Sequence, residues 1–175
     1  MATRESAAAE HIAAALSALG FEGDPEMGQT PRLVAGFLAE FVPDAPAPQL
    51  STFPSAGRDL VILRDLPFYS MCAHHLVPFF GTATVAYVPD ERIVGLGAVP
   101  RLLDHLARRP QLQERLGAQL ADALAEELSP IALGVRLTAR QMCMEMRGAR
   151  SPGTVETQVL RGASHAGLEA AIRGG

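Results

Sequence analysis

Cysteine and histidine side chains are grouped in one short stretch of this chain, Ser70-Met71-Cys72-Ala73-His74-His75. The stretch holds two of the five histidines and one of the two cysteines, and the other cysteine, Cys143, follows much later. Two thiolates and an imidazole suit zinc, and three protein ligands leave the fourth tetrahedral position to water, as in catalytic zinc sites. The residue types therefore predict a zinc centre formed by Cys72, His75 and Cys143.

A plainer interpretation of the same residues stays open, because each signal is weak when taken alone. A Cys-x-x-His pair occurs by chance, and a lone cysteine on an apolar strand is usually a small buried hydrophobic residue. If zinc is bound, it lowers the pKa of a bound water to about 7 and makes hydroxide available at neutral pH. His74, beside the ligand His75, can then act as a proton shuttle.

The composition is that of a globular protein. A length of 175 residues, 48% of them hydrophobic, suits one domain with an N-terminal appendage. The net charge of −4 gives no nucleic-acid footprint, and no apolar run approaches the ~20 residues of a membrane span. Two cysteines are too few for a disulfide framework, and the first ten residues lack the apolar core of a signal peptide. We expect a cytoplasmic protein with no nucleic-acid or membrane partner.

Helical spacing of apolar residues predicts two helices near the N-terminus. The first covers residues 7–19, and the second begins at Thr30-Pro31, an N-cap followed by proline. Prolines and small residues dominate from residue 42 to residue 56. Residues 1–56 are therefore expected to form an N-terminal helical segment with a linker.

The main domain is expected over residues 57–162, followed by a polar, disordered tail over residues 163–175. A turn is expected over residues 77–81, and a short strand or strand end over residues 93–96. Helices are predicted at residues 99–106 and from Pro110 to residue 128. β-Branched, aromatic and alternating runs predict the main strands at residues 60–69, 82–88, 131–143 and 154–160.

This order of elements predicts an α+β fold, with an antiparallel sheet covered by helices on one face. Alternation is clearest in the strand at residues 131–143, where a period of two places Gln141, Cys143 and Arg147 on one face. Arg147 is therefore the best placed of several arginines to bind an anionic substrate. Such a sheet is short and open at its edges, which favours association with further copies of the chain.

Several ordered segments resemble GTP cyclohydrolase I, across roughly residues 30–162. The resemblance implies a tunnelling fold (T-fold): a four-stranded antiparallel sheet with two helices between strands 2 and 3, here preceded by N-terminal helices. It also implies a toroidal homodecamer with active sites at subunit boundaries. The matching segments are Cys72-Ala73-His74-His75-Leu76-Val77-Pro78-Phe79-Phe80-Gly81, Val85-Ala86-Tyr87-Val88-Pro89, Ala107-Arg108-Arg109-Pro110-Gln111-Leu112-Gln113-Glu114-Arg115-Leu116 and Met142-Cys143-Met144-Glu145-Met146-Arg147-Gly148.

The activity that the resemblance implies is zinc-dependent hydrolysis of GTP to 7,8-dihydroneopterin triphosphate and formate, a step of pterin and tetrahydrofolate biosynthesis. In that family the zinc ligands fall on Cys72, His75 and Cys143, and a catalytic histidine falls on His74. Water attacks C8 of guanine and opens the imidazole ring. A second hydrolysis then releases formate, and the ring closes again after the ribose rearranges.

The resemblance also assigns substrate-binding residues. Gln113 and Glu114 match the pair that binds the guanine edge, where a carboxylate can accept from two N–H groups at once. Arg101 and Arg147 match phosphate-binding arginines. Gln141 occupies the position of a family histidine close to the second zinc cysteine, and we include it among the substrate-binding candidates.

The chain departs from the family pattern near the metal and the triphosphate. An amide at Gln141 cannot transfer protons as the family histidine does. Ala73 replaces an acidic residue, and Gly97-Ala98 replace a serine and a lysine. A basic residue usual at the position of Leu33 is also absent, although Arg32 lies next to it.

Three hypotheses follow for the function. The first is an ordinary GTP cyclohydrolase I. The second is a divergent zinc hydrolase that stops at the formamidopyrimidine stage or uses a purine substrate with fewer phosphates. The third is a catalytically silent, zinc-stabilised oligomer that acts as a binding protein, which the retention of His74 and Glu114 argues against.

Overall fold

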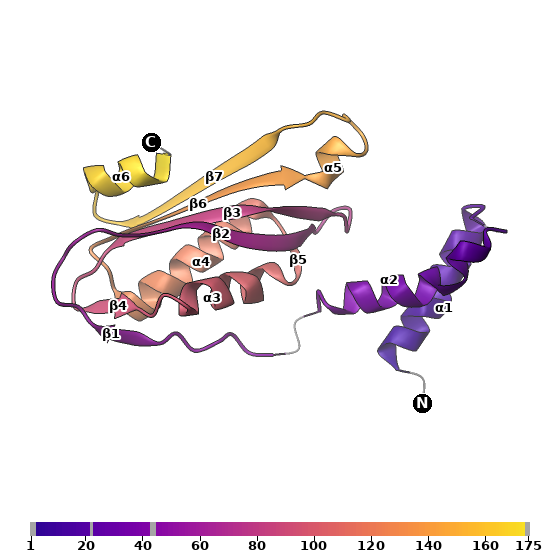
Figure 1. Cartoon of the computed structure of the whole chain (residues 1–175), viewed down its shortest axis with the longest axis horizontal. Helices are drawn as coiled ribbons and strands as arrows, with labels where there is room; N and C mark the ends of the chain where they lie inside the picture. The colour runs from indigo at the N-terminus through magenta and orange to yellow at the C-terminus, as the bar shows by residue number, and fades with distance from the viewer. Residues whose placement is uncertain (1–2, 22, 43–44, 174–175) are drawn as a thin grey trace. The chain divides into compact units, whose positions relative to one another are not determined.

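A computed structural model describes residues 3–21, 23–42 and 45–173 of the chain. The chain divides into two compact units, Met1–Asp44 and Ala45–Gly175 (Figure 1). Residues 43–44 of the predicted linker and residues 174–175 of the predicted tail lie outside the described residues. Within the described ranges, no helix is long and apolar enough to cross a membrane.

The first unit contains the predicted helices. Helix α1, Arg4–Ala18, is capped at its start by Thr3, whose Oγ1 accepts a hydrogen bond from Ser6 N at 3.2 Å. Helix α2 covers Thr30–Ala39. The predicted N-cap role of Thr30 is wrong, because a 3₁₀ helix, η1 at Pro25–Gln29, runs directly into α2 and no side chain caps its start.

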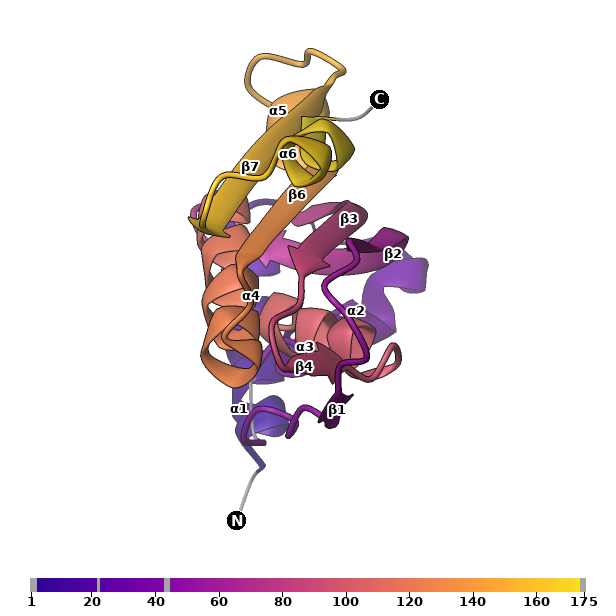
Figure 2. The ribbon, with the colours of Figure 1, turned by 90° about the vertical axis from the view of Figure 1, so that its left-hand side faces the viewer.

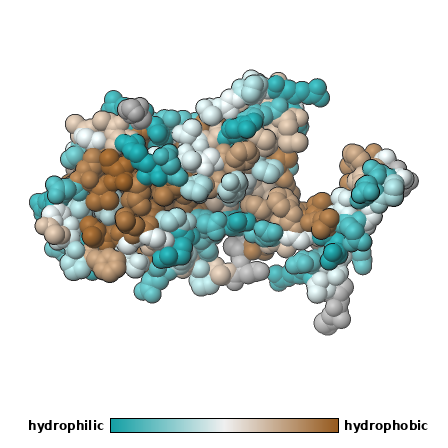
Figure 3. Space-filling view, in the orientation of Figure 1, coloured by the Kyte–Doolittle hydropathy of each residue, from teal (hydrophilic) through white to brown (hydrophobic). Residues whose placement is uncertain are grey.

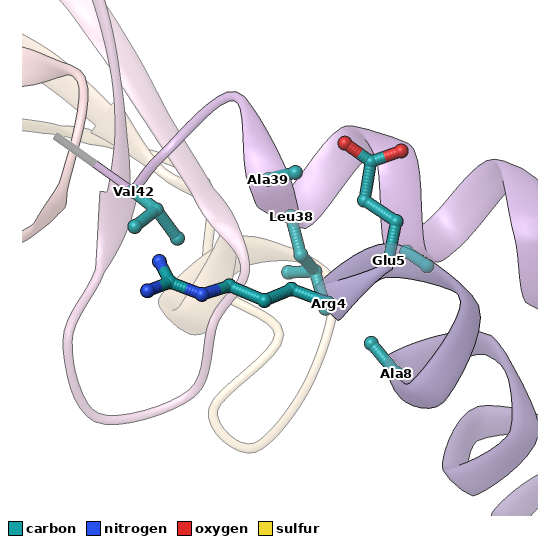
Figure 4. Close-up of a pocket in the computed structure, with 7 residues that line it drawn as sticks. Arg4, Glu5, Ala8, Leu38, Ala39 and Val42 are labelled. Atoms are coloured by element: carbon teal, nitrogen blue, oxygen red, sulfur yellow. The ribbon is translucent and has the colours of Figure 1, made fainter. Parts of the chain in front are cut away.

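Small residues let α1 and α2 approach each other around a cavity of about 220 Å³. Ala8, Ala35 and Leu38 line it, and Figure 4 shows Arg4 extending toward Val42 at its edge. The unit nevertheless leaves much apolar surface in solvent. Exposed fractions of its large apolar side chains include Leu19 at 73%, Phe21 at 57%, Leu33 at 62% and Phe37 at 41%.

The second unit is built on an antiparallel sheet with the order β2-β3-β6-β7, as Figure 1 shows. A short strand, β5, extends this sheet by pairing in parallel with the end of β2, and β1 pairs separately with β4. The strands are β1 Thr52–Pro54, β2 Val61–Cys72, β3 Pro78–Val88, β4 Arg92–Val94, β5 Pro110–Gln111, β6 Ala132–Gln141 and β7 Thr154–Gly162.

Helices cover both faces of this sheet. Helices α3, Ala98–Ala107, and α4, Gln113–Leu128, lie between β3 and β6 in the chain and pack on one face (Figures 1 and 2). A third helix, α6 at Ala166–Arg173, packs on the opposite face against β3 and β6. The predicted α+β order, with a helix pair between the second and third main strands, is therefore confirmed, but the expectation that helices cover only one face is wrong because α6 covers the other.

The main core lies between the sheet and the α3–α4 pair. Leu103, Leu120 and Leu124 are fully buried there against Val85 and Tyr87 of β3. The hydroxyl of Tyr87 accepts a hydrogen bond from Val94 N at 3.2 Å, which ties β4 to this core. Figure 3 shows further hydrophobic residues on the surface of this unit, on the side where β1 and β4 lie.

The structure also corrects the expectations for the C-terminal tail and for the segment that precedes the second main strand. The tail is not disordered over residues 163–173, because Leu168, Ala171 and Ile172 form one apolar helix face that is buried against Ala86 and Ala132. The turn predicted over residues 77–81 is largely strand, since β3 begins at Pro78. Proline is accepted at the first residue of a strand, where its missing N–H breaks no ladder hydrogen bond.

Replacing Leu168 with alanine is expected to lower the free energy of unfolding by about 2–5 kcal/mol, because a side chain only 2% exposed leaves a cavity. The matched control Leu96→Ala removes a side chain that is 68% exposed and should change stability by less than about 0.5 kcal/mol. Urea unfolding at fixed protein concentration measures both values. Equal effects of the two variants would show that α6 is not part of the folded core.

Candidate active site

The first two predicted metal ligands sit on a tight turn that connects β2 to β3. Cys72 is buried at the end of β2, and its carbonyl accepts from Leu76 N at 2.9 Å and from His75 N at 3.3 Å. Cys72 N donates to Val77 O at 2.9 Å, and Leu76 adopts a positive φ of 51°. The turn folds back on itself, so that His75 Nδ1 lies 3.7 Å from Cys72 Sγ.

The third ligand arrives through strand pairing. Strand β6 pairs with β3 so that Gln141 lies opposite Phe79, close to the start of β3. A short helical turn, α5 at Met142–Glu145, follows directly and carries Cys143 to the β2–β3 turn. The prediction that Cys143 shares a strand face with Gln141 and Arg147 is wrong, because β6 ends before Cys143 is reached.

The three side chains fit a single zinc ion. Their ligand atoms, the sulfurs of Cys72 and Cys143 and a ring nitrogen of His75, all lie within 4.8 Å of one another. Ligand atoms around a tetrahedral zinc lie about 3.6–3.8 Å apart, given zinc–sulfur bonds of about 2.3 Å. The 3.7 Å separation of Cys72 Sγ and His75 Nδ1 falls in that range. The ring planes of His74 and His75 lie at 76° to each other, with ring centroids 6.1 Å apart.

The electrostatics of the cluster also favour a cation. Burial raises the pKa of the Cys143 thiol, and the neighbouring charge of Cys72 raises it further, while Arg147 acts in the opposite direction. Thiolates this close repel each other unless a positive ion lies between them. The nearby carboxylate of Glu145 is already paired with Arg140, whose hydrogen bond lowers the pKa of Glu145.

The cluster opens onto a cavity of about 300 Å³. The cavity brings together most of the residues that the sequence had singled out, although they come from β2, α4, β6 and α5. Glu114 is exposed in the first turn of α4, and His74 is exposed on the β2–β3 turn. The residues that line the cavity are Cys72, His74, Phe79, Gln111, Leu112, Gln113, Glu114, Gln141, Cys143, Met144 and Val155.

Gln113 forms part of the cavity wall, but its side chain is already engaged by the protein. The residue is 3% exposed, and its Nε2 donates to Leu137 O at 3.1 Å and to Val155 O at 2.9 Å. Its Oε1 accepts from Gln141 Nε2 at 2.7 Å. Gln113 therefore fixes the start of α4, and the neighbouring Glu114, against β6 and β7.

A model of the family GTP cyclohydrolase I matches residues 8–171 of the chain. This protein belongs to the GTP cyclohydrolase I family. It is a hydrolase of the GTP cyclohydrolase I type, and the sequence-based resemblance is confirmed over most of the chain.

Relatives of this GTP cyclohydrolase I-like chain include two bacterial proteins named GTP cyclohydrolase 1. The protein of Lactiplantibacillus plantarum is 44% identical over 144 residues, which cover 79% of this chain and 76% of that protein. The protein of Geobacillus kaustophilus is 45% identical over 152 residues, which cover 82% of this chain and 81% of that protein.

Among solved structures, the GTP cyclohydrolase I-like chain is similar to the archaeosine synthase QueF-Like in its apo form. The TM-score is 0.51 at 18% sequence identity, over 61% of this chain and 96% of the other. Similarity at this level establishes the T-fold and no more.

The two arginines predicted to bind phosphate lie outside the cavity wall in this GTP cyclohydrolase I-like chain. Arg101 is exposed on α3, and Arg147 is exposed just after α5. A Cβ atom at Gly97 would lie only 3.2 Å from Arg101 Nη1. The guanidinium of Arg101 therefore occupies space beside Gly97, where the family pattern has a serine side chain.

Sequence reasoning gave no role to Gln111, which is fully buried in the cavity wall. Its backbone carbonyl accepts from Ala73 N at 3.0 Å, next to Cys72 of the candidate metal cluster. Its side chain donates to Gln119 Oε1 at 2.8 Å and accepts from Arg115 Nε at 2.6 Å. Gln111 thus ties the β2–β3 turn to α4, a role that its place between a proline and a leucine did not indicate.

Proposed function

We propose that this protein is a zinc-dependent GTP cyclohydrolase I that converts GTP to 7,8-dihydroneopterin triphosphate and formate. The observation that carries the proposal is the convergence of the Cys72, His75 and Cys143 cluster with Glu114 and His74 around one cavity. Family membership supports it, since the family model and the named relatives share this activity in their names.

Each group in the cavity has a task in this reaction. A zinc ion at the cluster would supply Lewis acidity and a water molecule acidified to a pKa of about 7. Glu114 accepts hydrogen bonds from the N1–H and the amino group of guanine and so orients the purine. Gln113 holds the start of α4, and with it Glu114, in place. His74, exposed at the cavity, moves protons to and from the reacting purine. Arg101 and Arg147 bind the triphosphate from outside the cavity wall.

Product analysis tests the proposal directly. Zinc-loaded protein is incubated with GTP, GMP and guanosine in separate reactions, and formate release, absorbance and product mass are followed. Dihydroneopterin triphosphate with one equivalent of formate from GTP is the expected result. A gain of one water without formate would replace the proposal with a hydrolase that stops at the opened ring.

That second candidate has a specific observation in its favour. The amide of Gln141, where the family pattern has a histidine, is hydrogen-bonded to Gln113 and cannot exchange protons with a substrate. Gly97 and Ala98 likewise offer neither hydroxyl nor ammonium to a triphosphate. This candidate opens the guanine ring but releases the formamidopyrimidine, or uses a substrate with fewer phosphates.

Gln141→His is expected to separate the two candidates. If the missing proton carrier limits turnover, the variant should raise formate release from GTP by roughly tenfold or more, since general acid–base catalysis contributes about 10²–10⁴. Formate is measured by a coupled assay at equal zinc content. No gain in the variant, together with full conversion by the wild type, would remove the second candidate.

The assembly and location of the protein are part of the same proposal. Exposed apolar side chains of the first unit and the open edge at β7 support a homo-oligomer, and the family resemblance points to a decamer. The free thiols of Cys72 and Cys143 suit a reducing compartment such as the cytoplasm. Zinc content without turnover of any purine would instead support the zinc-stabilised binding protein.

A further inference from the structure

The orientation of the Gln113 amide is forced by its surroundings. Its Nε2 lies 3.1 Å from Leu137 O and 2.9 Å from Val155 O, and backbone carbonyls can only accept hydrogen bonds. Turning the amide over would place its oxygen against two carbonyl oxygens in a site that is 3% exposed. The Oε1 atom of Gln113 must therefore face Gln141.

This constraint passes to the next amide. Because Gln113 presents its oxygen, the Gln141 amide must donate a hydrogen bond through its NH₂ group. Gln141 Nε2 lies 2.7 Å from Gln113 Oε1. The Oε1 atom of Gln141 is consequently the other end of that amide, and the hydrogen bond to Gln113 leaves it available to accept. Gln141 lines the same cavity as Cys72 and Cys143.

The cavity beside the Cys72 and Cys143 cluster is thus lined by a residue whose remaining polar atom is a hydrogen-bond acceptor, held in that orientation by Gln113. Intact guanine suits it poorly, because N7 on the imidazole edge is itself an acceptor. Ring opening adds one water: oxygen bonds to C8, the C8–N9 bond breaks, and the two water protons end on N7 and N9. The opened formamidopyrimidine therefore carries an N–H group where guanine carried a lone pair.

We propose that Gln141, held by Gln113, is a specificity-determining residue that favours the ring-opened formamidopyrimidine nucleotide over GTP. The inference rests on the proposed function, because it takes a guanine nucleotide as the ligand. It applies whether the bound formamidopyrimidine is processed further or released. The preference originates in the two backbone carbonyls, Leu137 O and Val155 O, that orient the Gln113 amide.

Binding to the metal-free protein tests this preference without turnover. Titration calorimetry compares GTP with its formamidopyrimidine triphosphate, prepared separately. The wild type should bind the opened nucleotide roughly tenfold more tightly than GTP. This factor corresponds to one hydrogen bond gained and one repulsion between two acceptors avoided. Gln141→Met should abolish the preference, and Gln113→Met should reduce it because the Gln141 amide is then free to turn. The control Gln158→Met, on an exposed residue of β7, should keep it.

The possible outcomes distinguish the preference for the opened nucleotide from the proposed function. An unchanged preference in Gln141→Met, with both nucleotides still bound, would overturn this inference and leave the proposed function intact. Failure of the wild type to bind either nucleotide would overturn both. Gln141 is only half-buried, so Gln141→Met decides the question even if the buried Gln113→Met variant does not fold.

Discussion

Cys143→Ser is expected to lower the zinc affinity of the protein by roughly a hundredfold or more. The hydroxyl of serine stays protonated at neutral pH and is a poor zinc ligand, so only Cys72 and His75 remain. Removing a group that only hydrogen-bonds to a zinc ligand lowers metal affinity by about 10–100-fold, and removing a direct ligand should lower it further. Elemental analysis gives the occupancy, and competition with a chromophoric chelator gives the affinity.

The control for this prediction lies close to the same site. Met146→Ser makes an exposed position just after α5 polar, at a side chain that is 64% exposed, and should leave zinc affinity unchanged. Loss of activity in Cys143→Ser should follow the loss of metal. A Cys143→Ser protein that retains a full equivalent of tightly bound zinc would refute the ligand assignment.

Glu114→Ala is expected to reduce kcat/KM for GTP by roughly a hundredfold or more. The substitution leaves the N1–H and amino donors of guanine without their charged acceptor, and hydrogen bonds to a charged group contribute about 1.5–3 kcal/mol each. Steady-state kinetics measure the loss, and calorimetry with GTP on metal-free protein shows whether it arises in binding.

Glu127→Ala provides a matched control, because Glu127 is exposed near the other end of the same helix, α4. It removes the same charge from the protein but none from the cavity, so kcat/KM should stay near the wild-type value. Equal losses in both variants would indicate an effect of net charge or helix stability. Unchanged GTP affinity in Glu114→Ala would remove Glu114 from the guanine site.

The strands and helices that form the core were predictable because their side chains alternate or repeat with clear periods. Leu133, Val135 and Leu137 mark β6 in this way, and all three are fully buried. Helix α6 was missed because its three apolar residues stand among glycine, alanine and charged neighbours, so the segment reads as polar. Its packing against β3 and β6 supplies the stability that its own sequence lacks.

The grouping of Cys72, His75 and Cys143 was predictable from chemistry, since few combinations of residues offer two thiolates and an imidazole. The path of the chain through Cys143 was not predictable, because the alternation of β6 breaks only at Gln141, and the run Met142-Cys143-Met144 that follows does not by itself distinguish a strand from a helical turn. The hydrogen bonds of the Gln113 and Gln111 side-chain amides could not be predicted from the sequence. Gln113 reaches carbonyls of β6 and β7, and Gln111 donates to Leu106 O of α3 at 3.0 Å, and only the folded chain shows which carbonyls lie next to these amides.

The ligand cluster also has a consequence for the order of folding. Cys72 and Cys143 belong to distant parts of the chain and meet only after β3 has paired with both β2 and β6. A metal ion bound there would act as a cross-link across a long chain loop, and such links restrict the unfolded chain more than the folded one. Metal capture should therefore be a late event in folding, and a chelator would speed unfolding as well as stop chemistry.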